Sequence, residues 1–350
     1  MKVLALTRYS RLGASSRLRT FQYVPFCAKL GVDIKIFPLL GDDYLGRFYE
    51  GNPLNWLEIF KSYFFRLKLL LTSNKYDLLW IEKELFPNLP AWFEQILNSL
   101  GIRYIVDYDD AIFHNYDSSR NPFKRMLSEK IDKVMRAADV VICGNEYICE
   151  KAIIAGARKT EILPTVIDLE RYKVLDVPLR NRLVIGWIGS PYTVKYLNLV
   201  APALQILAKE IPFQLRVIGA DFAIEGVNVE CHPWREDLEV AHIHEFDVGI
   251  MPLPDSPFER GKCGYKLIQY MACGKPVVAS PVGVNKKIVS NDVGILALDK
   301  ADWVKALRLL FLNRGDGITM GRQGRIVVEG KYCVQATSTR LVELFHEATK

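Results

Sequence analysis

Two stretches of the chain carry residue types that could do chemistry, and the first runs from Pro257 to Gly283. It opens with a basic loop that contains glycines and continues as a predicted helix over 264–273. Backbone N–H groups at a helix start, with Arg260, Lys262 and Lys266 nearby, suit an anion such as a phosphate group. The alternative is an ordinary loop, helix and strand whose lysines are solvated. The stretch alone does not decide between these two interpretations.

The second stretch follows a predicted strand over 102–106 and reads Asp107-Tyr108-Asp109-Asp110, with His114 four residues further on. Ligands of open α/β sheets gather at the carboxyl ends of the strands, so these side chains form a candidate site. The aspartates could instead cap the next turn, or bind Mg²⁺ or Mn²⁺ through their oxygens. All three interpretations stay open at this point.

The elements around these stretches alternate between strand and helix in both halves of the chain. This alternation predicts an α/β fold of two Rossmann-like, doubly wound domains that face a cleft. In the first half, Ser15 or Ser16 is expected to cap a helix that reaches Leu30. No GxGxxG motif is present, so we expect neither a nicotinamide nor a flavin cofactor. The strands are expected over 2–7, 32–37, 76–81, 102–106, 138–144, 183–190, 213–219, 227–231, 247–252 and 276–280.

The domain boundaries follow from changes in composition. We expect an N-terminal domain over 1–167, a linker over 168–182 and a second domain over 183–331. An amphipathic helix over 334–348 ends the chain, and we expect residues 332–350 to cross back to the N-terminal domain.

A predicted helix over 53–72 is unusual because Trp56, Phe60 and Phe64 share a broad apolar face with basic residues around it. This pattern is typical of a helix that lies in the interface of an anionic membrane. A helix buried between the layers of the domain is the alternative.

The net charge, the cysteines and the apolar runs of the chain exclude several classes of protein. The 350 residues carry a net charge of +6, which is too modest to argue for nucleic acid and fits an anionic ligand or membrane surface. The seven cysteines include no CxxC pair, which favours reduced thiols in the cytoplasm. The apolar stretch over residues 1–7 is too short for a signal peptide and is followed at once by Arg8. No apolar run is long enough to span a membrane. His242 and His244 would not share a helix face, so we expect no metal site there.

The chain resembles the GT-B glycosyltransferases, and most of all the retaining enzymes of glycosyltransferase family 4 (group 1). The similarity rests on MACGKPVVASPVG after a basic helix, on GWIGSP at the start of the second domain and on FDVGIMPLPD before the motif. GASSRLR and DYDDAIF in the first domain support it. It covers essentially the whole chain.

The resemblance implies roles for individual residues of the second domain. It places the diphosphate near Gly264 and Tyr265, and the nucleobase beside Trp234. Gln269 stands where the family usually has a carboxylate for the ribose, and a glutamine can still bond a hydroxyl group. Glu259 is expected to replace the family's other glutamate, since Gly261 occupies its position. Lys195 and Lys266 are expected in catalysis, and Gly189, Ser190 and Lys262 in substrate binding.

In the first domain, the resemblance assigns Asp109, Asp110 and His114 to catalysis and Gly13 and Arg17 to substrate binding. The implied reaction moves a sugar from a nucleotide-sugar to a glycan or lipid-linked acceptor, with retention and without a metal or other cofactor. It implies a role in cell-surface polysaccharide or glycoconjugate biosynthesis. The expected location is the cytoplasm, with peripheral contact at the inner face of the cell membrane through 53–72. A nucleotide-sugar epimerase of the same fold and a non-catalytic nucleotide-sugar binder are the alternatives.

Overall fold

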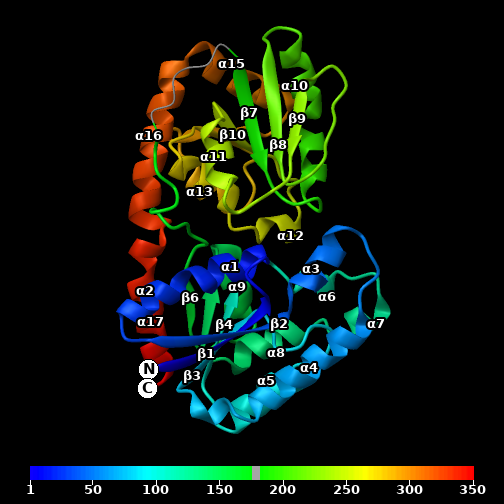
Figure 1. Ribbon diagram of the computed structural model, residues 1–350, viewed down its shortest axis with the longest axis vertical. Coiled ribbons are helices and arrows are strands. Elements are labelled where there is room, and N and C mark those ends of the chain that lie inside the picture. Colours follow the sequence, from blue (N-terminus) through cyan, green and yellow to red (C-terminus); the bar gives the residue numbers. More distant parts are fainter. Residues whose placement is uncertain (176–181) are drawn as a thin grey trace. The chain divides into compact units, whose positions relative to one another are not determined.

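The computed structural model describes residues 1–175 and 182–350 and divides the chain into two compact units. Unit 1 comprises Met1–Val166, Gly261–Cys263 and Val334–Lys350, and unit 2 comprises Ile167–Arg260 and Gly264–Cys333. Each unit is an α/β body with its own parallel sheet (Figure 1).

The sheet of unit 1 has six parallel strands in the order β2-β1-β3-β4-β5-β6. Short apolar strands alternate with helices, and each crossover returns the chain in the same direction, as in doubly wound folds. The strands are β1 (Lys2–Tyr9), β2 (Asp33–Leu40), β3 (Leu78–Glu82), β4 (Tyr104–Tyr108), β5 (Val140–Cys143) and β6 (Thr160–Ile162).

Both faces of this sheet are covered, because alternate residues of each strand enter different cores. Leu79 and Ile81 of β3 belong to one core, whereas Leu78 and Trp80 belong to the other. The second core includes the last helix, whose Phe345 ring meets Trp80 edge-on at a centroid distance of 5.2 Å. The longer helices of unit 1 are α2 (Val24–Lys29), α3 (Asp42–Tyr49), α4 (Trp56–Leu70), α5 (Trp92–Ser99), α8 (Lys130–Ala137), α9 (Glu146–Ile154) and α17 (Val334–Ala348).

The helix expected from Ser15 or Ser16 to Leu30 is wrong as a single element. The chain forms α1 (Ala14–Arg19), the 3-10 turn η1 (Phe21–Tyr23) and then α2. Pro25 lies in the first turn of α2, where it is tolerated but cannot continue the ladder of an earlier helix. Gly13, rather than a serine, is the N-cap of α1. The remaining short elements are η2 (Ser73–Lys75), α6 (His114–Asp117) and α7 (Pro122–Arg125).

Unit 2 repeats the design with six parallel strands in the order β12-β11-β10-β7-β8-β9. The strands are β7 (Leu183–Ile188), β8 (Phe213–Ile218), β9 (Val229–His232), β10 (Val248–Met251), β11 (Val277–Ala279) and β12 (Gly294–Leu296). The helices are η3 (Val194–Leu199), α10 (Ala201–Ala208), α11 (Glu239–His244), α12 (Pro257–Arg260), α13 (Tyr265–Ala272), α14 (Asn285–Ile288), α15 (Lys300–Leu312) and α16 (Arg314–Lys331).

The predicted linker over 168–182 differs from the structure in its first half. Tyr172 is almost fully buried in a core of unit 2, so residues 168–175 are part of that unit. Residues 176–181 lie outside the described residues.

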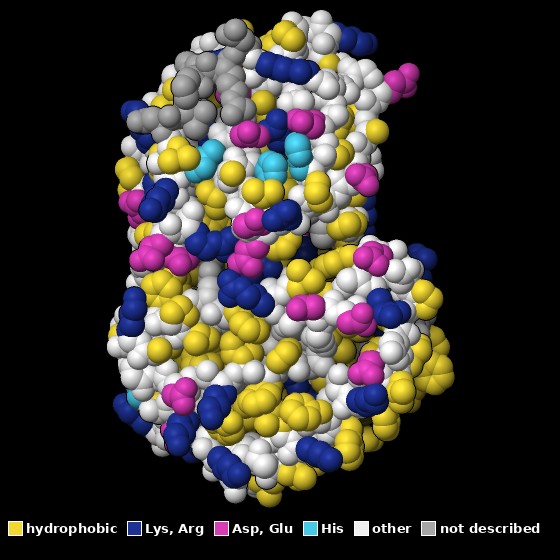
Figure 2. All heavy atoms as spheres, viewed as in Figure 1, with side chains coloured by type: hydrophobic (Ala, Val, Ile, Leu, Met, Phe, Trp, Pro, Cys, Tyr) yellow, Lys and Arg dark blue, Asp and Glu magenta, His cyan; other side chains and the backbone are white. Residues whose placement is uncertain are grey.

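The surface of α4 tests the alternative of a buried helix over 53–72. Trp56, Phe60 and Phe64 are 75%, 72% and 53% exposed, whereas Arg66 on the opposite face is buried. Arg66 donates to the backbone oxygens of Thr7 and Phe37 at 2.6 and 2.8 Å, which anchors the helix on unit 1. Figure 2 shows hydrophobic side chains, with Lys and Arg among them, along the edge where Figure 1 labels α4. The expectation of a fully buried helix is therefore wrong for these aromatics.

No helix of the described residues combines the length and the apolar character needed to cross a membrane.

Candidate functional site

The carboxyl edge of the unit 1 sheet gathers charged side chains from neighbouring strands. Lys83 directly follows β3 and adopts a left-handed backbone conformation, with φ of +66°. Such a conformation is costly for a residue with a side chain and is often found at functional sites. The backbone N–H of Lys83 still donates to Asp107 of β4 at 2.9 Å, so the turn is fixed by the sheet itself.

Asp109, just after β4, lies in a closed set of bonds with Lys83 and Ser15. The Lys83 Nζ is 2.9 Å from Asp109 Oδ1 and 3.0 Å from Ser15 Oγ, and the Ser15 hydroxyl donates to Asp109 Oδ2. Burial disfavours the charged carboxylate, but the Lys83 ammonium outweighs it and lowers the pKa of Asp109 to about 2. Asp109 is therefore an anion at neutral pH and cannot serve there as a proton donor.

A second ion pair lies beside the first. The Lys262 Nζ is 2.9 Å from Asp110 Oδ1, and Lys262 belongs to the Gly261–Cys263 segment of unit 1. Asn145, the N-cap of α9, fixes that segment by donating to the backbone oxygen of Gly261 at 2.8 Å. The predicted residues Asp109, Asp110 and Lys262 thus meet at one sheet edge, with two lysines balancing two aspartates.

The other unit 1 residues from the sequence have different surroundings. Both ring nitrogens of His114 are engaged, with Asp117 at 3.0 Å and the Tyr147 hydroxyl at 2.8 Å, and no described bond joins His114 to Asp109. Arg17 is buried and donates to the backbone oxygens of residues 11 and 12. Gly13 is held against Tyr9, because a Cβ atom at residue 13 would lie 2.5 Å from the Tyr9 Cβ.

Sequence reasoning missed Lys83, Ser15 and the two glutamates that flank Lys83. Glu82 is buried, accepts the Ser16 hydroxyl at 2.6 Å and has its pKa raised, chiefly by burial. Glu84 pairs with the buried Lys130 at 2.5 Å. The available signal was the run of charged residues directly after the predicted strand over 76–81, at the end of the strand where ligands gather.

The Asp109 ion pair makes a testable contribution to acid stability. A carboxylate whose pKa is lowered in the folded state stabilises the fold above its unfolded pKa, near 4, and loses this as pH falls toward the folded value. We expect Asp109→Asn to lose about 2 kcal/mol of unfolding free energy at neutral pH, with the difference shrinking between about pH 4 and pH 2. Urea unfolding of both proteins across this range measures it. A difference that is independent of pH would contradict the assignment.

In unit 2, the start of α13 is the expected anion site. Gly264 is the N-cap, with φ of +65°, and a Cβ atom there would lie 2.3 Å from Ile288 Cδ1, so this position needs glycine. Gly274, with φ of +69°, ends the helix region as predicted. Leu267, Ile268 and Met271 are fully buried, which confirms the predicted inner face of α13.

Lys266 and Gly189 both lie at the indole of Trp187 in β7. The Lys266 Nζ is 5.6 Å from the ring centroid, a cation–π distance. A Cβ atom at Gly189 would lie 2.5 Å from the same ring. Next to Gly189, the Ser190 N–H donates to Thr193 Oγ1 at 3.3 Å, which shapes the turn after β7.

Lys195 and Glu259 meet a common neighbour, Tyr196. The Lys195 Nζ lies 5.5 Å from the centroid of the Tyr196 ring and 4.8 Å from that of Tyr192. The Tyr196 hydroxyl donates to the buried Glu259 carboxylate, which also accepts the Ser256 hydroxyl. Glu259 thus has a partner on η3 and one beside its own helix.

A second network joins Trp234, Tyr265 and Gln269 through Glu239 and Tyr172. The Trp234 Nε1 donates to Glu239 at 2.7 Å, and the Tyr172 hydroxyl donates to the other oxygen of Glu239. Gln269 is buried and donates to the Tyr172 hydroxyl at 2.9 Å. The Tyr265 hydroxyl lies 3.3 Å from the same Tyr172 hydroxyl. Gln269 thus supports this network, and the buried carboxylate within it is Glu239, which the sequence did not single out.

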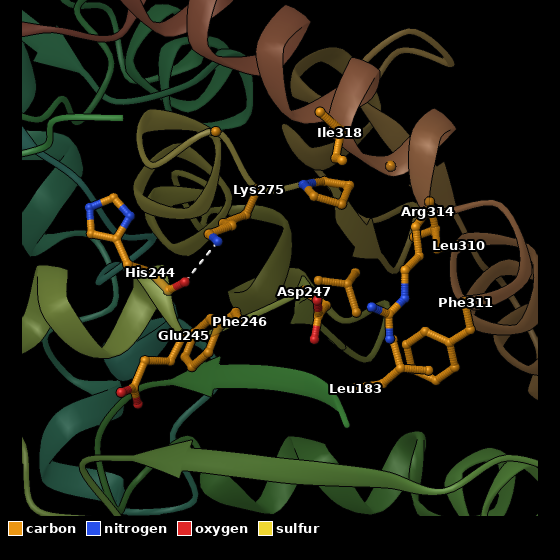
Figure 3. A pocket seen from close by; sticks show the side chains of 14 residues that line it. Leu183, His244, Glu245, Phe246, Asp247, Lys275, Leu310, Phe311, Arg314 and Ile318 are labelled. Carbon is orange, nitrogen blue, oxygen red and sulfur yellow. Dashed lines mark hydrogen bonds between the residues drawn. The ribbon is translucent and has the colours of Figure 1, made fainter. Parts of the chain in front are cut away.

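A small hollow of about 100 Å³ lies elsewhere in unit 2 (Figure 3). Its walls include Leu183 and Val248, the first residues of β7 and β10, so it lies at the amino edge of the sheet. Lys275 crosses toward the backbone oxygen of His244 at 2.8 Å, as the dashed line shows. Ligands of parallel sheets bind at the carboxyl edge, so we do not assign this hollow to the expected nucleotide-sugar.

Within residues 1–175 and 182–350, no three or more His, Cys, Asp or Glu side chains are grouped so that they could hold a metal ion.

Comparison with known proteins connects both units to one fold. The model of the family Glycosyl transferases group 1 matches residues 182–313, which hold β7 to β12 and most of the unit 2 site. Over 99% of this chain, the structure superposes on sucrose-phosphate synthase from Thermosynechococcus elongatus, covering 98% of that chain, with a TM-score of 0.75 and 15% identity. The superposition on Anabaena HepE in complex with UDP-glucose covers 99% of each chain, with a TM-score of 0.71 and 16% identity. The fold is that of the GT-B glycosyltransferases.

Curated relatives show weaker sequence similarity. A Bacillus subtilis protein named as a teichuronic acid biosynthesis glycosyltransferase, TuaH, is 25% identical over 193 residues, which are 47% of this chain and 46% of that protein. A D-inositol 3-phosphate glycosyltransferase from Geodermatophilus obscurus is 28% identical over 142 residues, 40% of this chain and 28% of its own. The chain therefore spans less than half of the length of these relatives. The GT-B expectation for the fold is confirmed.

Proposed function

We propose that this protein is a glycosyltransferase that moves a sugar from a nucleoside-diphosphate sugar to a glycan or lipid-linked acceptor, with retention. The observation that carries the proposal is the coincidence of the group 1 match with the carboxyl edge of unit 2. That edge presents the glycine-capped start of α13, Lys266 and Trp234 from neighbouring elements. HepE, with the same fold, was solved in complex with UDP-glucose.

The chemistry that this edge supports is charge stabilisation of a leaving diphosphate. Cleaving the sugar–phosphate bond adds negative charge to the phosphate, and preorganised cations lower the barrier by stabilising it. We propose that Lys266, Lys195 and the N-terminal N–H groups of α13 supply this stabilisation, so that no metal is required. With retention, the bond between the sugar carbon and the phosphate oxygen breaks, and its electron pair leaves with the phosphate. The phosphate oxygen takes the proton of the acceptor hydroxyl, while the acceptor oxygen bonds the sugar carbon on the same face.

In unit 1, the Lys83–Asp109 and Lys262–Asp110 pairs are proposed to bind the sugar hydroxyl groups. Carboxylates accept strong hydrogen bonds from hydroxyls, and the two lysines hold both aspartates in place. Because Asp109 holds its charge at neutral pH, we assign it to orientation rather than to proton donation.

The test of the reaction uses a panel of UDP-, GDP- and ADP-sugars with and without membrane extract as the acceptor source. Release of the nucleoside diphosphate that increases with extract, and an anomer retained in the product by NMR, are the expected results. If no nucleoside diphosphate is released with any of these sugars, the proposal that the protein is a glycosyltransferase is rejected. An isomerised sugar released without any acceptor would favour an epimerase of the same fold.

We further propose that the exposed face of α4 docks on an anionic membrane, so that the protein works as a peripheral enzyme at the cytoplasmic face. Exposed aromatic rings prefer the bilayer interface, and lysines are drawn to anionic headgroups. Lys61 and Lys68 lie on α4, and the Lys68 Nζ is 4.6 Å from the centroid of the Phe64 ring.

Replacing Trp56, Phe60 and Phe64 together by serine is expected to release the protein from vesicles that contain phosphatidylglycerol. The melting temperature should stay near that of the wild type, because these rings are largely exposed. Co-sedimentation with vesicles at two salt concentrations measures the effect. Phe123→Ser, which changes an exposed aromatic on α7, is the matched control. Unchanged co-sedimentation of the triple variant would reject the docking face.

A further inference from the structure

Four aromatic rings form a surface row at the carboxyl end of β1 and on α3 in unit 1. The rings of Tyr9 and Tyr44 are 6.2 Å apart between centroids and 25° from parallel. Those of Tyr44 and Phe48 are 6.3 Å apart and only 4° from parallel, and Tyr49 follows at 5.9 Å from Phe48. We call Tyr9, Tyr44, Phe48 and Tyr49 the aromatic row.

One end of the aromatic row, Phe48 and Tyr49, is exposed to solvent, while Tyr9 and Tyr44 are partly buried. Tyr44 and Phe48 are four residues apart on α3 and so share a helix face, while Leu45 turns inward and is buried. Phe48 and Tyr49 are 51% and 45% exposed. Large apolar side chains that cluster on the surface usually mark a binding site, because the packing of the protein's own core does not require them there.

Polar and charged groups lie at the Tyr9 end of the aromatic row. The Arg8 guanidinium lies 5.6 Å from the centroid of the Tyr9 ring, and the Ser10 hydroxyl bonds Asp42 at the first turn of α3. Tyr44 and Tyr49 contribute phenolic hydroxyls. The row therefore offers flat apolar faces with hydrogen-bonding groups at their edges, unlike the exposed face of α4, where aliphatic and aromatic side chains dominate.

The aromatic row is fixed to the Asp109 site by short connections within unit 1. The Tyr9 N–H donates to the Ser16 hydroxyl oxygen at 3.1 Å. Ser15, which precedes Ser16 in the chain, donates its hydroxyl to Asp109. Gly13 allows the intervening loop to close on the Tyr9 side chain. A ligand stacked on the row would thus extend from the same sheet edge that holds the two aspartates.

We infer that the aromatic row is a saccharide subsite, and that it binds the sugar units of the acceptor next to the one that receives the new linkage. A pyranose ring has a face of C–H groups, which suits the negative face of an aromatic ring, and a rim of hydroxyls, which suits Arg8 and Asp42. The inference rests on the proposed function and adds to it that the acceptor is recognised through its glycan part.

The test compares wild type, Phe48→Ala and Phe48→Tyr on a printed array of defined oligosaccharides, followed by titration of the best ligand in solution. Phe123→Ala, an exposed phenylalanine outside the row, is the matched control. Each protein is also titrated with UDP, GDP and ADP. Circular dichroism and melting temperature verify that each variant is folded.

We expect the wild type to bind oligosaccharides and Phe48→Ala to bind them roughly tenfold more weakly, the change that about 1.4 kcal/mol produces. Phe48→Tyr should keep the affinity, and nucleotide affinity should not change in any variant. The inference is overturned if no oligosaccharide binds to the wild type, or if Phe48→Ala binds like the wild type. A parallel loss of nucleotide affinity would also overturn it, since the row would then stack a nucleobase. Absence of nucleotide binding in the wild type would instead count against the proposed function.

Discussion

Replacing Lys83 by methionine is expected to cost about 3–5 kcal/mol of unfolding free energy and to abolish most sugar transfer. The variant leaves the Asp109 carboxylate buried without the ammonium that lies 2.9 Å from it. An unpaired buried charge is expensive, so Asp109 would take up a proton or draw in water, and in both cases it would lose its present orientation. Urea unfolding and nucleoside diphosphate release measure the two effects.

Two further variants separate the loss of charge from the loss of the side chain. Lys83→Arg keeps a cation at the end of β3 and should recover part of the stability. Lys83→Met combined with Asp109→Asn removes both charges, and should be more stable than Lys83→Met alone if the unpaired carboxylate is the cause. Equal stabilities of the single and double variants would show that the ion pair is not what Lys83 contributes.

Lys266→Ala is expected to lower turnover by about 10²–10³-fold and to weaken nucleotide binding, the usual result of removing one preorganised group that stabilises a leaving oxyanion. Thermal stability should stay near wild type, because a cation–π contact such as that between the Lys266 ammonium and the Trp187 ring contributes about 0.5–1 kcal/mol. Steady-state kinetics, nucleotide titration and melting temperature together measure this.

The matched control for this prediction is Lys305→Ala, which removes an exposed lysine from α15. It should change neither turnover nor stability. Lys266→Arg should keep part of the turnover, because the charge is preserved. If Lys266→Ala turns over at the wild-type rate, the diphosphate site lies elsewhere.

The sequence predicted those parts of the fold that local patterns determine. The apolar spacing of α13 and its final glycine define a helix that the structure has over Tyr265–Ala272. The helix expected over 334–348 is α17, with the same bounds. In contrast, the place of Ser16, which was expected as a helix cap, depends on a contact with the sheet edge. Ser16 bonds Glu82, which is 66 residues away, and no local pattern contains that information.

The sequence predicted part of the geometry around Asp109. Charged residues at strand ends indicated that their side chains gather at one sheet edge, because parallel strands bring their carboxyl ends together. The left-handed Lys83 is not visible in a sequence, since lysine has no preference for that conformation. Likewise, the burial of Gln269 against Tyr172 depends on a segment that looked like a polar linker.

The path of the chain between the units has a consequence for protein engineering. Unit 1 takes Val334–Lys350 from the far end of the chain, and that segment supplies Phe345 to the core around Trp80. A fragment that ends at Val166 would therefore lose the part of the core that α17 supplies on one face of its sheet. A hybrid made with a relative should inherit residues 1–166, 261–263 and 334–350 from the same parent, so that only unit 2 is exchanged. Swaps that cut the chain once, near residue 167, would instead separate halves of a single hydrophobic core.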